Sequence, residues 1–134
     1  MSLRKDLVKI DIQEHAYVLV YHKDLEIGCG VAIVLYLYNT VFLKFDCFGK
    51  NKVHYHIFNN NNNNRIYFTE LTVAEQIDKS ISELSNNITK YLATSPNEKI
   101  KDFIFDKPLF LSKIAEAKQI MLGYENTFYA AICR

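Results

Sequence analysis

The spacing of apolar residues changes halfway along this chain of 134 residues, and no other feature constrains its fold as strongly. Early in the chain apolar and polar residues alternate, as in the run from Val8 through Ile10 to Ile12, and a period of two predicts β-strands. From Thr72 onward apolar residues recur every three or four positions, which is the period of an amphipathic helix. Strands followed by helices, without alternation of the two, predict an α+β fold.

Strands are expected within residues 7–69, arranged as an antiparallel meander of about five strands. The turns at 38–40 and 49–52 are short, whereas parallel strands need a crossover of about a dozen residues or more. Residues 31–38 are almost uniformly apolar or aromatic, which is typical of a central strand covered on both faces. The run of asparagines at 59–64 has no apolar face to bury, and it predicts a polar loop between strands.

Helices are expected within residues 72–123. Thr72 and Glu75 have the spacing of a capping box, and Gly123 is a natural end for the second helix. Two amphipathic helices after a meander are expected to cover one face of its sheet, and the length fits a single domain over residues 1–134. The first helix carries a stripe of apolar residues: Val73, Ile77, Ile81, Leu84, Ile88 and Leu92.

The composition argues against several classes of protein. With 16 basic and 15 acidic residues the formal net charge is +1, so no strong positive field favours a nucleic-acid partner or an anionic membrane surface. No apolar run reaches the roughly 18 residues of a membrane-spanning helix, and the first residues lack the apolar core of a secretory signal. The three cysteines are odd in number and widely spaced, which favours a reducing compartment, and we expect a cytoplasmic protein.

The face of the sheet that the helices do not cover indicates whether the chain has a partner subunit. Two helices cover only one face, yet residues 31–38 are expected to be apolar on both, and the chain has nine Tyr and nine Phe residues. Either the N-terminal strands curl over the second face or a second subunit covers it. Because the two-fold dimer is the commonest closed assembly, we expect a homodimer.

The residues suited to chemistry gather around one expected hairpin. If it closes through residues 49–52, Cys47 lies opposite His54, and His56 projects on the same side because alternate strand residues share a face. A three-residue turn instead places Asp46 opposite His54. Two imidazoles beside a thiolate or a carboxylate form a ligand set for zinc or another divalent transition metal. The simpler alternative is that the histidines form the polar face of an ordinary strand.

The same region carries a resemblance to a known family. A family of short bacterial proteins of unassigned function is similar to this chain in three segments: Leu35-Tyr36, Val41-Phe42-Leu43-Lys44-Phe45-Asp46-Cys47-Phe48-Gly49 and His54-Tyr55-His56. The resemblance covers most of residues 7–122 and is specific only in the middle part. The chain departs from the family at residues 28–32, where Gly-Pro is expected, and in the asparagine run. It implies a shared fold with a helical C-terminal half, and it brings no activity, cofactor or substrate.

The sequence supports three functional hypotheses. The first is a non-catalytic α+β module that binds a partner or a small ligand. The second is a metal-binding or metal-dependent site on the hairpin, formed by His54, His56 and either Cys47 or Asp46. The third is a small-molecule enzyme with a His–carboxylate pair in a cleft between sheet and helices. We take the first as the prediction, keep the second as its alternative, and assign no catalytic residue.

Overall fold

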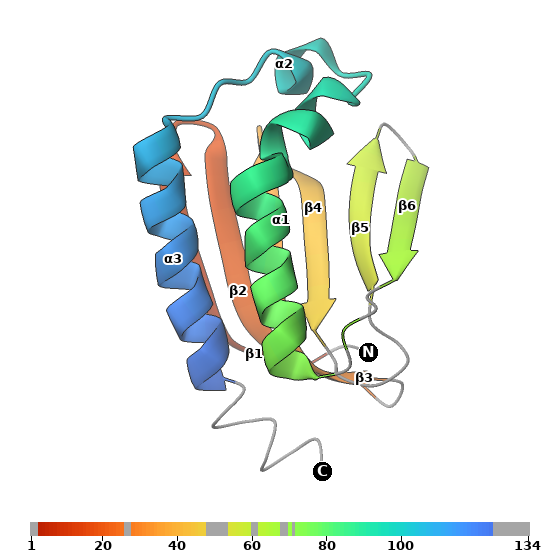
Figure 1. Cartoon of the computed structure of the whole chain (residues 1–134), viewed down its shortest axis with the longest axis vertical. Helices are drawn as coiled ribbons and strands as arrows, with labels where there is room; N and C mark the ends of the chain where they lie inside the picture. The colour runs from red at the N-terminus through yellow and green to blue at the C-terminus, as the bar shows by residue number, and fades with distance from the viewer. Residues whose placement is uncertain are drawn as a thin grey trace.

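The computed structural model describes most of the chain (Figure 1). The described backbone covers residues 3–25, 28–47, 54–59, 62–67, 70 and 72–124, and the described side chains cover 7–23, 30–47, 70 and 72–124. The predicted turn at 49–52 lies outside these residues. The elements in chain order are β1 (Leu3–Gln13), β2 (Ala16–Leu25), β3 (Gly28–Leu37), β4 (Thr40–Cys47), β5 (His54–Asn59), β6 (Asn62–Tyr67), α1 (Val73–Ala93), α2 (Glu98–Lys101) and α3 (Lys107–Tyr124).

The strands form one antiparallel sheet in which their spatial order is their order in the chain, from β1 to β6. The predicted α+β class and antiparallel meander are confirmed. The main part of the sheet consists of the four longer strands, β1–β4. The six-residue strands β5 and β6 extend it as a hairpin, whereas the sequence predicts about five strands in all.

The asparagine run takes part in this hairpin instead of forming a loop over 59–64. Asn59 is the last residue of β5, and Asn62 is the first residue of β6 and pairs with it. Asparagine is depleted in strands, but the hydrogen bonds of a ladder involve only the backbone. Pairing with β5 therefore outweighs the preference of the side chains, and the polar composition alone did not reveal it.

Helices α1 and α3 lie side by side on one face of the sheet, as predicted (Figure 1). The Thr72 hydroxyl accepts a hydrogen bond from the Glu75 backbone N–H at 3.1 Å and donates one to the Glu75 carboxylate at 2.8 Å. The first of these bonds satisfies a backbone donor that has no partner within the helix, and it marks the start of α1. At the surface, Lys118 of α3 forms an ion pair of 3.0 Å with Asp78 of α1.

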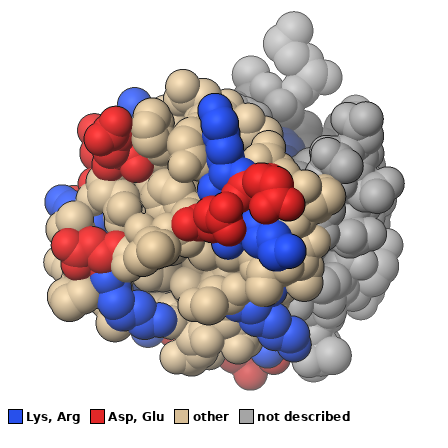
Figure 2. Space-filling view, turned by 90° about the horizontal axis from the view of Figure 1, so that it is seen from above, with Lys and Arg blue, Asp and Glu red and all other residues tan. Residues whose placement is uncertain are grey.

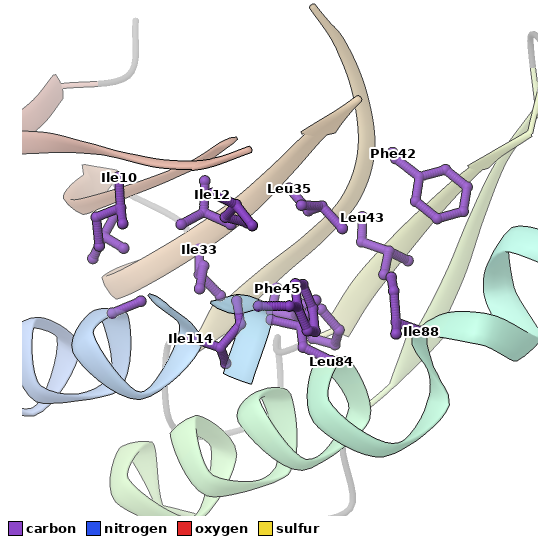
Figure 3. Packing of buried hydrophobic residues seen from close by; sticks show 14 of the residues in the cluster. Ile10, Ile12, Ile33, Leu35, Phe42, Leu43, Phe45, Leu84, Ile88 and Ile114 are labelled. Carbon is purple, nitrogen blue, oxygen red and sulfur yellow. The ribbon is translucent and has the colours of Figure 1, made fainter. Parts of the chain in front are cut away.

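The main hydrophobic core fills the space between these helices and the near face of the sheet (Figure 3). Ile33 of β3 and Phe45 of β4 meet Leu84 of α1 and Ile114 of α3 there, and all four are fully buried. Each such side chain contributes about 1.5–3 kcal/mol by leaving water. The apolar stripe of α1 predicts this packing, because its period places those residues on one face.

A second, smaller cluster lies on the opposite face of the sheet. Tyr21 of β2 and Ala32 and Val34 of β3 are buried there within the single chain. The central strand β3 is thus covered on both faces, as its apolar sequence predicts. Because the chain itself buries these residues, their coverage does not require a second subunit, and the homodimer stays a prediction.

Replacing Leu84 with alanine is expected to lower the free energy of unfolding by about 2–5 kcal/mol, because the change leaves a cavity in the core. The matched change Lys79→Ala on the same helix is expected to cost less than about 1 kcal/mol. Its side chain is 42% exposed and its ion pair with Glu83 spans 3.9 Å. Urea denaturation followed by circular dichroism measures both values. Equal losses at the two positions would contradict the assignment of the buried face.

Candidate functional site

The register between β4 and β5 decides which residues of the predicted hairpin site lie opposite one another. Asp46 pairs with His54, and Lys44 pairs with His56. This is the second of the two registers that the sequence leaves open, so the residue opposite His54 is Asp46 and not Cys47. The side chains of His54 and His56 lie outside the described residues, and a metal site at this hairpin stays a prediction.

Cys47 belongs to the main core, on the helix side of the sheet. Its sulfur is 3.4 Å from the hydroxyl oxygen of Ser80 on α1. Burial raises the pKa of the Cys47 thiol from 9.0 to about 12; the Ser80 hydrogen bond opposes this shift, and the charge of Asp46 adds to it. Since the thiolate is the form that attacks electrophiles and binds metals, Cys47 has the properties of a structural core residue.

Asp46 lies on the opposite face of the sheet, in a cross-strand row with Ala32 of β3 and Tyr21 of β2. The residue is 4% exposed, and its two neighbours in the row are fully buried. The backbone register continues this row to His54 on β5. Of the predicted ligands, the register therefore brings Asp46 and His54 to the same cross-strand position. Among the side chains that the structure describes, no group of three or more His, Cys, Asp and Glu residues is placed to hold a metal ion.

A second candidate site, which the sequence does not single out, lies in the connection between α2 and α3. Gln13, at the end of β1, holds this segment in place. Its side-chain amide donates a hydrogen bond to the Ile104 carbonyl oxygen at 3.1 Å, and its side-chain carbonyl accepts one from the Asp106 N–H at 2.8 Å. A single side chain thus satisfies two backbone groups of the segment, so that the backbone on both sides of residue 105 is tied to the sheet.

Ile104 is the exposed residue of this segment. The residue is 83% exposed, whereas Phe103 and Phe105 on either side of it are half-buried against the main core. The Phe103 ring meets the Tyr38 ring edge-on, with centroids 5.9 Å apart, and the Phe105 ring centroid is 4.4 Å from that of Phe110. The two phenylalanines anchor the segment, and the anchored segment presents an isoleucine side chain to solvent.

A small pocket opens beside Ile104, between the segment and the C-terminal half of α1. The Lys107 ammonium donates a hydrogen bond to the Ser85 carbonyl oxygen of α1 at 3.2 Å and so bridges the two walls. The volume of the pocket is about 180 Å³. A cavity of about 150 Å³ holds one benzene ring, while typical small-molecule sites measure about 300–1,000 Å³, so this pocket has the size of one side chain. Its lining residues are Ile88, Thr89, Leu92, Phe103, Ile104, Phe105 and Lys107.

We refer to Ile104 together with this pocket as the Ile104 surface. Charges of both signs are interspersed with uncharged surface at this end of the molecule, as Figure 2 shows from above. Residues 98–107 include three acidic and three basic residues, all of them exposed. Because the two signs are equal in number, the net charge of this segment is zero. These charged residues are Glu98, Asp102, Asp106, Lys99, Lys101 and Lys107.

The structure defines an α+β domain with an antiparallel meander and helices on one face, and none of its described helices has the length and apolarity needed to cross a membrane. Residues 6–120 match a family described as a domain of unknown function (DUF7700), and the chain belongs to that family. This agrees with the predicted membership of a family of unassigned function. Neither a curated protein nor a solved structure matches the chain.

One sequence signal is compatible with the Ile104 surface, although it does not identify it. The segment Phe103-Ile104-Phe105 is an apolar triplet between Asp102 and Asp106, and it is equally typical of a short buried strand. Phe103 and Phe105 pack against the main core, and the backbone of Ile104 is hydrogen-bonded to Gln13, which is 91 positions away in the chain. Local sequence therefore could not locate this site.

The Cys47 thiol is expected to be unreactive in the native protein. In a variant with Cys29→Ser and Cys133→Ser, a disulfide reagent at a pH below 9.0 should label Cys47 only after denaturant is added, because burial keeps the thiol protonated and inaccessible. The pKa of the Cys47 thiol is higher in the folded protein than in the unfolded chain. Its contribution to the free energy of unfolding is therefore fully present below pH 9.0 and is lost as the pH rises toward about 12. Rapid labelling without denaturant, absent after the further change Cys47→Ala, would contradict the assignment.

Proposed function

We propose that this chain is a non-catalytic binding module of the cytoplasm that contacts another protein through the Ile104 surface. The observation that supports the proposal is the Ile104 residue, 83% exposed and held beside a pocket of about 180 Å³. Leaving an isoleucine in water forgoes the roughly 1.5–3 kcal/mol that its burial contributes. A partner that covers Ile104 recovers this free energy.

The rigidity of the segment also favours a role in binding. Gln13 holds the backbone at Ile104 and at Asp106, and the flanking Phe103 and Phe105 pack on the core. A side chain on a fixed backbone has less conformational entropy to lose when it binds. The free energy of burying Ile104 then contributes more fully to affinity than it would from a flexible loop.

The chemistry of the surface limits the kind of partner. The pocket accepts a single apolar side chain, since its walls are formed mainly by residues such as Ile88, Leu92 and Phe105. The balanced charges around it provide no net attraction for a polyanion such as a nucleic acid. The expected partner is therefore a protein surface that carries an exposed aliphatic or aromatic side chain.

A photo-crosslinking amino acid at position 102 tests the proposal, because Asp102 is exposed and adjoins the pocket residue Phe103 without lining the pocket itself. In cells that express the chain natively, illumination should give a discrete protein adduct. The change Ile104→Asp should remove the adduct, since a charge at the centre of an apolar contact is costly, and Ile104→Val should retain it.

The matched control places the same crosslinker at position 119, where Gln119 is exposed on α3. No discrete adduct is expected from it. Equal labelling from positions 102 and 119, or an adduct at position 102 that Ile104→Asp leaves unchanged, would refute the proposed role of the Ile104 surface.

The register at the β4–β5 hairpin favours a second candidate function, the binding of zinc or another divalent transition metal. His54 is paired with Asp46, whose residue is 4% exposed, and His56 is two positions further along the same strand. A carboxylate and two imidazoles are ligands that these metals accept. We favour Asp46 over Cys47 as the third ligand, because Cys47 faces the main core and its thiol pKa is raised by burial.

Isothermal titration calorimetry with zinc tests this second function. Asp46→Asn and the double change His54→Ala with His56→Ala should abolish binding, because each removes ligands that a three-ligand site needs. Cys47→Ser should leave the affinity unchanged. The control is His15→Ala, which removes an exposed histidine at the β1–β2 turn. Absence of zinc binding by the unmodified chain would end this proposal.

A further inference from the structure

We infer that the protein that occupies the Ile104 surface is a second copy of this chain, related to the first by a two-fold axis. The inference rests on the proposed function of that surface and specifies its partner. It follows from the presence of a projecting side chain and a matching pocket in the same small region of one molecule.

The projecting group and the pocket are complementary in chemistry and in size. Ile104 is aliphatic and 83% exposed, and the pocket beside it is walled mainly by Ile88, Leu92, Phe103 and Phe105. Its volume of about 180 Å³ accommodates one such side chain. A molecule that carries both parts of a contact can form that contact with itself.

The closeness of the two parts makes the contact compatible with two-fold symmetry. In a two-fold interface the same patch is used by both subunits, so a contact from residue i to residue j is accompanied by one from j to i. Ile104 is itself one of the residues that line the pocket. An axis beside Ile104 therefore lets each copy insert its isoleucine into the pocket of the other, and the two contacts form together.

The charges around the patch permit two copies to approach. A strongly charged patch repels itself across a two-fold axis, because each charge meets charges of the same sign. Here the exposed acidic and basic residues within 98–107 are equal in number. The balance removes net repulsion between copies, and it gives no preference for a partner of high charge.

Pairing of two sheets through the edge strand β1 is a less suitable route to a dimer. The register of β1 with β2 is interrupted between Lys5 and Val8 and again between Asp11 and Gln13. Such irregularities bend an edge strand and disfavour its pairing with another chain. Gln13, at the end of this strand, is also engaged in holding the Ile104 segment.

Two variants separate the parts of the contact. Ile104→Asp removes the projecting side chain and retains the six other residues that line the pocket, whereas Thr89→Trp fills the pocket and retains Ile104. Because the chain has no tryptophan, the emission of the new indole reports whether it is enclosed in the pocket. Leu7→Asp is the matched control, since Leu7 is another exposed apolar residue and lies on β1.

Analytical ultracentrifugation and native mass spectrometry measure the expected result. The unmodified chain and Leu7→Asp should both show a concentration-dependent monomer–dimer equilibrium, while each of the two variants alone should be monomeric with an unchanged melting temperature. An equimolar mixture of Ile104→Asp and Thr89→Trp should form a heterodimer, because one of the two contacts is restored. Its dissociation constant should be about tenfold to a hundredfold higher than that of the unmodified dimer.

Three results would overturn the inference: an unmodified chain that stays monomeric, a dimer that Ile104→Asp does not weaken, or a mixture without heterodimer. They are distinct from failure of the proposed function. A monomeric chain that still gives an Ile104-dependent adduct from position 102 binds a different protein, so the proposed function stands and the second copy is excluded. A monomeric chain without such an adduct overturns both.

Discussion

The central strand β3 buries side chains on both faces of the sheet, and the core of the structure depends on this double burial. On one side Ile33 and Leu35 support the core beneath α1 and α3; on the other Ala32 and Val34 join the smaller cluster. Burial of both faces leaves the lateral edges for backbone pairing, and β2 and β4 occupy them. The pairing of β2 and β4 with β3 and the packing of α1 and α3 on its near face follow from this arrangement.

The Ile104 surface shows how the core determines an exposed feature. Phe103 and Phe105 are drawn toward the core by their apolar rings, and Gln13 ties the backbone of the segment to the end of β1. With its two neighbours and its backbone held, Ile104 projects into solvent. The exposure of an apolar side chain here results from local anchoring, which is why we associate it with binding and not with disorder.

The hairpin of β4 and β5 illustrates how a shift of one residue separates chemical groups. Successive residues of a strand point to opposite faces, so Cys47 enters the main core while Asp46 joins the row that continues to His54. From the sequence, both registers were compatible with the spacing of Asp46, Cys47 and His54. The choice between them changes the candidate ligand from a thiol of raised pKa to a nearly buried carboxylate.

The sequence by itself determined the α+β class, the antiparallel order of the strands, the start of α1 at Thr72 and the buried stripe that contains Leu84. These features depend on the period of apolar residues and on short-range capping, and both are local in the chain. Only the tertiary structure decided the register at His54, the pairing of the asparagine run and the exposure of Ile104. Each of these depends on which strand or side chain lies next to the segment in space, and Gln13 reaches Ile104 across 91 positions of sequence. Contacts of that separation leave no periodic trace in the sequence, because they are set by the packing of the whole domain.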